Sequence, residues 1–321
     1  MGNLYQNQLD LHRSPSYTDT LTHKAENVIL QKDDIAITLT GTNNKRDFGY
    51  TYIFNDEKNL LLNQRCGLIR AKGNPYFLSC LLKTHTFLNQ FFESATGGTG
   101  NQANVSTKAM EMFSVNTPSL KEQEKIGQLM ALLDERIATQ NKIIDKLQSL
   151  IKGIADKLFQ TARTTKPLLE FAPNITSGTD KSGSGTIPLY GSTGIIGTVK
   201  NASQKGNIVL VARVGTIGTV QYVNEPCGVS DNALIVEAGE MTKYIYHFLK
   251  TYNFTRITSG TTQPLITASS LKKAAIPTYD IESQTRIVLC LNGLEKKLDM
   301  AKQYLSDIAV MKQYLLRQMF I

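Results

Sequence analysis

The feature of this sequence that most constrains its fold is an internal repeat. Sliding the 321-residue chain along itself by about 161 positions places Gln123 on Gln284, and the same offset places Gln102 on Gln263. Solenoid repeats run roughly 20 to 50 residues, so a period this long indicates a duplicated unit of domain and helix. The sequence therefore predicts two copies of one plan, with pseudo-twofold symmetry.

Each copy begins with a predicted mixed α and β globule. The segment KDDIAITLTGT (32–42) faces KGNIVLVARVGT (205–216) in the repeat. Apolar residues alternate with small or polar ones in both, as in half-buried strands. Further along, NPYFLSCLLKTHTFLNQFF and MTKYIYHFLKTYNF carry helical spacing.

Each copy ends in a long predicted helix. Ser119 and Glu122 form a capping box before the first helix, and Asp280 can cap the second. Apolar residues then recur at alternating spacings of three and four, typical of a coiled coil. They are Ile126, Leu129, Leu133, Ile137, Ile144, Leu147, Ile151, Ile154 and Leu158 in the first helix, and Ile287, Leu291, Leu294, Leu298, Ala301, Leu305, Ile308, Met311 and Leu315 in the second.

The predicted fold class is α+β: two mixed α/β domains separated by two long helices that form an antiparallel coiled coil. A helix of about 40 residues is on the order of 60 Å long, so the pair would hold the globules apart. The alternative is that each helix packs as an amphipathic element on its own globule. The expected domains are 1–118, 119–164 (central helix), 165–279 and 280–321 (C-terminal helix).

Composition limits the partners and the compartment. The formal net charge is +8, which favours a polyanion such as nucleic acid, although many basic proteins bind none. The four cysteines and four histidines are scattered without zinc spacing, so core thiols in a reducing compartment are expected. No apolar run reaches the ~18 residues of a membrane helix and no signal peptide is visible, which predicts a cytoplasmic protein.

Motifs for catalysis are incomplete. GNPYF (73–77) resembles the base-gripping loop of amino-methyltransferases, but it has one proline and no upstream Gly-rich cofactor loop. The Gly-rich segments lack the Gly-Lys-Ser/Thr ending of a phosphate loop. No nucleophile elbow or His-Glu-x-x-His pair occurs, and most carboxylates lie beside lysines on the long helices.

What remains is a set of polar loops that could read DNA. They are GTNNKRDFG and GGTGNQANVS in the first copy, and SGTDKSGSGT, YGSTG, ARVGTIG and SGTTQ in the second. Arg can be bidentate to guanine, Asn or Gln to adenine, and hydroxyls hold phosphates; the alternative is that these loops only connect elements. The candidate DNA-binding residues are Asn43, Asn44, Lys45, Arg46, Asn101, Gln102, Ser177, Thr179, Lys181, Tyr190, Ser192, Arg213, Thr216, Thr261 and Gln263.

Together these residues resemble the specificity subunit of type I restriction-modification systems, across most of the chain. The resemblance rests on QKDDIAI (31–37) and QKGNIVL (204–210), on the R-x-G-x-I-G pattern of Arg213 to Gly218, and on SGTTQPLIT (259–267). In both copies, a helix start that contains a glutamine and is followed by a long coiled coil completes the resemblance. One departure is that residues 1–31 contain nothing like PLLEFAPNITSGT (167–179), which opens the second domain. The first domain is therefore expected to be shortened at its N-terminus.

The resemblance implies two target-recognition domains, each reading one half of a split DNA sequence, with the helices setting the spacer. It implies a chain without a catalytic centre or cofactor of its own. The implied partners are double-stranded DNA, two methyltransferase (modification) subunits that use S-adenosylmethionine to methylate adenine N6, and a restriction subunit that uses ATP and Mg for translocation and cleavage. The alternative function is a coiled-coil interaction or scaffold protein without specific DNA binding.

Overall fold

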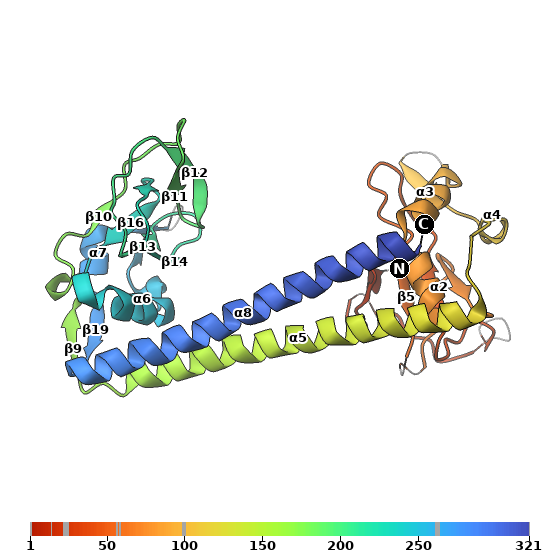
Figure 1. Cartoon of the computed structure of the whole chain (residues 1–321), viewed down its shortest axis with the longest axis horizontal. Helices are drawn as coiled ribbons and strands as arrows, with labels where there is room; N and C mark the ends of the chain where they lie inside the picture. The colour runs from red at the N-terminus through yellow and green to blue at the C-terminus, as the bar shows by residue number, and fades with distance from the viewer. Residues whose placement is uncertain are drawn as a thin grey trace. The chain divides into compact units, whose positions relative to one another are not determined.

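The computed structural model describes residues 2–13, 15–21, 26–55, 57, 59–97, 101–260 and 264–320. The chain divides into two compact units (Figure 1). The first unit comprises residues 1–141 and 303–321, and the second unit comprises residues 142–302. Each unit thus combines one globule with part of both long helices.

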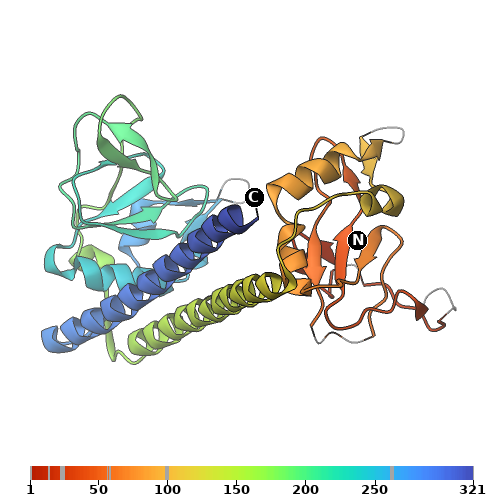
Figure 2. The ribbon, with the colours of Figure 1, turned by 45° about the vertical axis from the view of Figure 1, so that its right-hand side comes forward.

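The first unit is built on short antiparallel sheets, seen in red to orange in Figure 2. One has the order β5-β3-β6, one has the order β4-β8-β7, and a hairpin joins β1 to β2. The strands are β1 (Leu4–Tyr5), β2 (Gln8–Leu9), β3 (Ile35–Thr38), β4 (Thr40–Thr42), β5 (Thr51–Ile53), β6 (Cys66–Ile69), β7 (Thr96–Gly97) and β8 (Gln102–Asn104). The helices are α2 (Pro75–Leu81), α3 (His85–Glu93) and α4 (Thr107–Glu111).

The second unit has a four-stranded sheet of order β10-β16-β13-β14 and a three-stranded sheet of order β12-β11-β15. Two further pairs, β9 with β19 and β17 with β18, complete its β structure. The strands are β9 (Thr164–Pro167), β10 (Thr176–Ser177), β11 (Ile187–Tyr190), β12 (Ile195–Val199), β13 (Ile208–Ala212), β14 (Val220–Val223), β15 (Gly228–Val229), β16 (Ala233–Val236), β17 (Thr258–Ser259), β18 (Leu265–Ile266) and β19 (Ala275–Thr278). The helices are α6 (Thr242–Thr251), α7 (Ala268–Lys272) and the 3-10 turns η1 (Leu168–Glu170), η2 (Gly239–Met241) and η3 (Phe254–Arg256).

The central strands β3 and β13 are buried along their whole length, so the prediction of half-buried strands was wrong for them. Alternate residues of a strand point to opposite faces. In β13, Val209 and Val211 enter one hydrophobic cluster whereas Ile208 and Leu210 enter another. Both faces of the sheet are therefore covered. A strand in such a sheet has no solvent-facing side, so its residues need not alternate between apolar and polar.

Two long helices link the globules in sequence: α5 (Leu120–Gln160) and α8 (Ile281–Met319). In the first unit, the Tyr304 hydroxyl lies 3.2 Å from the Arg136 guanidinium, and Lys312 pairs with Asp134. Later residues of α8 thus meet earlier residues of α5. In the second unit, the start of α8 lies against the end of α5 (Figure 1). The predicted antiparallel coiled coil is confirmed.

The repeat extends to single hydrogen bonds at the two helix starts. Gln123 Nε2 donates to the Pro118 carbonyl at 3.0 Å, and Gln284 Nε2 donates to the Tyr279 carbonyl at 2.9 Å. Both predicted caps are present: the Ser119 hydroxyl donates to Glu122, and Asp280 accepts from the Ser283 backbone N–H. The sequences around the two equivalent glutamines therefore form the same local structure.

Equivalent positions of the repeat also hydrogen-bond each globule to a long helix. Asp134 on α5 and Glu295 on α8 occupy matching positions in the repeat. Asp134 accepts a hydrogen bond from the Tyr76 hydroxyl at 2.6 Å, and Glu295 accepts one from the Tyr246 hydroxyl at 3.4 Å. In each unit, a tyrosine of the globule thus donates a hydrogen bond to a carboxylate on one of the long helices.

Two predicted seam residues, Leu129 and Met311, are exposed. Leu129 is 39% exposed, and the fully buried residue is its neighbour Met130. Ile126 packs on the globule core, and Met130 follows it one turn along the same helix face. Met311 is 48% exposed, because its neighbour Lys312 turns toward Asp134 instead.

The expectation of core thiols holds in part. Cys80 and Cys227 are buried, Cys66 is half-buried, and Cys290 is exposed on α8. Within the described ranges, no helix combines the length and apolar character needed to cross a membrane.

Candidate DNA-binding surfaces

In the first unit, strand pairing brings together the two polar segments singled out in the sequence. β4 pairs with β8 so that Thr42 lies opposite Gln102. Beyond the last pair, the Asn43 backbone N–H donates to the Asn101 carbonyl at 2.8 Å. The exposed turn 43–46, which holds Asn43, Asn44, Lys45 and Arg46, therefore lies beside the exposed residues Asn101 and Gln102.

Arg46 is held in place by its surroundings. Its backbone has a positive φ of 47°, and its N–H donates to the Thr42 carbonyl at 2.9 Å. Its guanidinium lies over the Phe92 ring, 5.1 Å from the centroid. Stacking of this kind stabilises the cation and fixes the plane of its donors. The turn thus presents an oriented arginine.

A polar hollow of about 410 Å³ lies next to this turn. Its lining residues are Thr40, Gly41, Thr42, Asp47, Arg65, Asn101 and Gln102. The exposed Arg65 was missed in the sequence because it stands in no Gly-rich or amide-rich loop. Its carbonyl accepts from the Leu39 N–H at 2.9 Å, which brings it to the hollow.

In the second unit, Arg213, the first residue after β13, joins the turn between β15 and β16 to strand β18. The Arg213 N–H donates to the Asn232 carbonyl at 3.0 Å, and its carbonyl accepts from the Ile266 N–H at 3.0 Å. Within the described residues, the buried Nε of Arg213 has no hydrogen-bond partner. A buried donor without a partner is costly, which makes it a candidate for a contact with a bound molecule.

The β11–β12 hairpin adds Ser192 to this group. The Ser192 carbonyl accepts from the Thr216 hydroxyl at 3.5 Å and from Gln221 Nε2 at 3.3 Å. Gly215 and Gly218 have φ of 71° and 80°, a region that glycine adopts without strain. The loop that follows Arg213 can therefore fold tightly against the hairpin.

Sheet register places the start of the predicted 177–186 loop at the same edge. Ser177 in β10 pairs with Leu234, and the Gly178 N–H donates to the Ala233 carbonyl at 3.1 Å. Ala233 in turn pairs with Ala212, directly before Arg213. The exposed Thr179 and Lys181 follow on this loop.

Two polar residues at this edge were not singled out in the sequence. The turn between β15 and β16 supplies Asn232, which bonds Arg213, and Ser230, whose N–H donates to the Tyr190 carbonyl at 2.9 Å. The buried Ser230 hydroxyl has no partner among the described residues. The polar SDN triplet before an apolar strand is the only sequence signal for this turn.

Tyr190 lies at this edge, but its hydroxyl is already engaged. It donates to Glu225 Oε1 at 2.8 Å. Burial, together with this hydrogen bond, raises the pKa of Tyr190 to about 12.

The remaining candidates, Thr261 and Gln263, lie outside the described residues. In the part of the chain that is described, no group of three or more His, Cys, Asp or Glu side chains is placed to hold a metal ion.

Comparisons with known proteins agree with this architecture. The family model of the type I restriction modification DNA specificity domain matches residues 2–149 and again residues 165–309. The specificity subunit of a type I restriction-modification system from M. genitalium superposes with a TM-score of 0.69 at 19% identity, covering 97% of this chain and 87% of that chain. A chain from a study of type I restriction-modification complex assembly superposes at 0.56 with 17% identity, covering 91% and 82%.

A protein of Methanocaldococcus jannaschii assigned as the specificity subunit of the type I restriction enzyme MjaX is 27% identical over 142 residues. That alignment covers 40% of this chain and spans about a third, 33%, of the relative. The family model matches most of the chain, in two copies that coincide with the internal repeat. The chain therefore belongs to the family of type I restriction-modification DNA specificity domains.

Proposed function

We propose that this protein is the DNA-recognition subunit of a type I restriction-modification complex, in which each globule reads one half of a bipartite DNA site. The observation that carries the proposal is the repeat itself. Two copies of one fold each present polar loops beside a strand end, at Asn43 to Arg46 in the first unit and at Arg213 in the second. Two similar domains on one chain are suited to a DNA site that consists of two half-sites.

The chemistry of these loops supports a DNA partner. Arginine and amide side chains make bidentate contacts to base edges, and hydroxyls and loop N–H groups hold phosphates. The net charge of +8 favours a polyanion and predicts salt-sensitive binding. The candidate base readers are Arg213 in the second unit, and Arg46, Asn101 and Gln102 in the first.

The long helices are the proposed docking site for two modification subunits. Several large apolar side chains on these helices are exposed, in addition to the apolar residues that are buried between them. They include Leu132, Ile143 and Leu150 on α5, and Leu289, Met300 and Val310 on α8. A docked partner would remove this apolar surface from water, which would favour binding. In this proposal, S-adenosylmethionine, ATP and Mg belong to the partner subunits, and this chain performs no catalysis.

The same exposed residues suit a scaffold protein that binds other helices and no specific DNA. Retention of DNA distinguishes the two functions. We expect the purified chain, with its modification partner, to retain sheared genomic DNA in a filter-binding assay. Affinity should fall steeply between about 50 and 200 mM salt. Partner binding without such retention would favour the scaffold function instead.

A further inference from the structure

The β11–β12 hairpin of the second unit exposes two consecutive isoleucines. Ile195 is 62% exposed and Ile196 is 49% exposed, and both belong to β12, an edge strand of the β12-β11-β15 sheet. Proteins usually protect edge strands with charged side chains or proline, because a bare apolar edge associates with other molecules. Two exposed branched apolar side chains at this edge therefore indicate a contact surface.

A β-bulge distinguishes the two isoleucines. The pairing of β11 with β12 shifts register between Leu189 and Tyr190, so that Ile196 is an extra residue of β12. The Ile196 side chain lies over the hairpin turn, since a Cβ placed on Gly191 would lie 2.9 Å from its Cδ1 atom. Bulges redirect side chains and are common beside functional sites. Ile196 thus packs on the turn, and Ile195 is the more exposed of the pair.

The hairpin lies between the two loops of the second unit that carry candidate DNA-binding residues. On one side, the Gly183 N–H donates to the Thr198 carbonyl at 2.9 Å, which joins β12 to the 177–186 loop. On the other side, the Thr216 hydroxyl donates to the Ser192 carbonyl at 3.5 Å, which joins the hairpin turn to the loop after β13. The isoleucines therefore belong to the edge proposed to read DNA.

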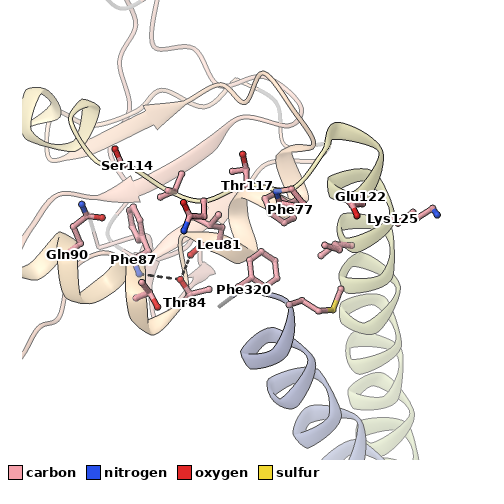
Figure 3. Close-up of a pocket in the computed structure, with 16 residues that line it drawn as sticks. Phe77, Leu81, Thr84, Phe87, Gln90, Ser114, Thr117, Glu122, Lys125 and Phe320 are labelled. Atoms are coloured by element: carbon pink, nitrogen blue, oxygen red, sulfur yellow. Dashed lines mark hydrogen bonds between the residues drawn. The ribbon is translucent and has the colours of Figure 1, made fainter.

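The position of the hairpin suits an approach to base edges. In the first unit, the buried residues Phe77, Leu81 and Phe87 are recessed in an open groove of about 560 Å³ (Figure 3). The β11–β12 hairpin instead lies at the end of the second unit remote from the long helices (Figure 1, Figure 2). The major groove of DNA admits a two-stranded β-ribbon, so side chains on such a hairpin can reach the bases.

The surroundings of the isoleucines favour DNA over a protein partner. Residues 192–194 and 197–198 are all serine, threonine or glycine, so the exposed apolar surface of this stretch is confined to the two isoleucines. A stable protein interface needs about 800 Å² on each partner. In the major groove, the thymine methyl is an apolar group among hydrogen-bond donors and acceptors. An apolar pair between loops that carry Lys181 and Arg213 matches that pattern.

We propose that Ile195 contacts the methyl group of one thymine in the half-site read by the second unit. Apolar side chains recognise thymine in this way, because the three other bases of DNA lack the methyl group. The inference rests on the proposed function and adds the identity of one base pair. The half-site of the second unit thus contains an A·T pair at a fixed position.

Replacement of single thymines by deoxyuridine tests the contact, because uracil lacks only the methyl group. The probes are duplexes that carry the site mapped from methylated adenines, each with one thymine replaced. The complex of the chain with its modification partner should bind one of these duplexes about fourfold more weakly than the parent duplex, which is the value of one buried methyl group. Ile195→Ala should bind both duplexes equally. Ile195→Val, which keeps a branched apolar side chain, should keep the difference.

Leu169→Ala is the matched control, because Leu169 is an apolar residue that is 47% exposed on η1. It should keep the fourfold difference. A parent complex that binds the site but tolerates deoxyuridine at every thymine would overturn the proposal. Uniform weakening by Ile195→Ala with the difference intact would also overturn it, and would assign Ile195 to a wedge between base steps. A parent complex that binds no site duplex would contradict the proposed function itself.

Discussion

At the scale of single residues, Arg213 stands out because its backbone is fixed while its side chain is incompletely paired. Hydrogen bonds at its N–H and its carbonyl join it to the turn between β15 and β16 and to strand β18. Its buried Nε has no partner in the described part of the chain. In the proposed contact with DNA, a backbone already fixed in this way lowers the ordering cost of binding.

We predict that Arg213→Ala weakens specific DNA binding by about 1 to 3 kcal/mol and relaxes specificity at one position, as loss of a base contact would. Competition binding with substituted sites measures both effects. Arg163→Ala, at an exposed residue just beyond α5, is the control and should bind as the parent does. A uniform loss across all sequences would assign Arg213 to a phosphate, and unchanged binding would remove it from the interface.

The surroundings of Tyr76 predict how the stability of the fold changes at alkaline pH. Burial, and then the hydrogen bond to Asp134, raise the pKa of Tyr76 above its usual value of 10.0. The unfolded chain releases this proton above about pH 10, so stability is full below that pH and falls as the pH rises through and beyond it. Tyr76→Phe should therefore make the alkaline decline shallower in urea midpoints measured from pH 8 to 11. Tyr314→Phe, at a residue 61% exposed, should leave the slope unchanged.

Among the helices and strands, those whose residues follow a single repeating apolar spacing could be predicted from the sequence. Both long helices, their caps and the repeat were predictable, because capping and apolar spacing are local signals. The buried faces were less predictable: Met130 is buried where Leu129 was predicted, on the helix face that also carries Ile126, which packs on the globule. The convergence at Arg213 depends on the register of three strands, and Arg65 reaches its hollow through a hydrogen bond distant in sequence. Neither follows from a motif.

The two helix-start glutamines give a prediction at this scale. Gln123→Ala and Gln284→Ala each remove a hydrogen bond to a carbonyl directly before a long helix. We expect each change to lower the free energy of unfolding by about 1 kcal/mol. Denaturant unfolding should show similar losses, whereas Gln128→Ala, at an exposed glutamine, should cost much less. Losses restricted to one of the two sites would argue against equivalent roles.

At the scale of the whole molecule, the proposed role of the helices is to set the unread spacer. Inserting one heptad into the middle of both α5 and α8 keeps the seam in phase. It lengthens the pair by about 10 Å, close to the rise of about 3 base pairs. We expect the preferred spacer to grow by about that number while both half-sites stay the same. Altered half-sites with an unchanged spacer would contradict this role.

The proposal that each unit reads one half-site is tested most directly by the DNA sequence that the assembled complex methylates. Methylated adenines mapped in cells that carry this chain and its modification partner should define two half-sites separated by a fixed unread gap. Arg213→Ala should change one half-site, and Arg46→Ala should change the other. A single continuous motif, or a change of both halves by either substitution, would contradict the claim that each unit reads one half.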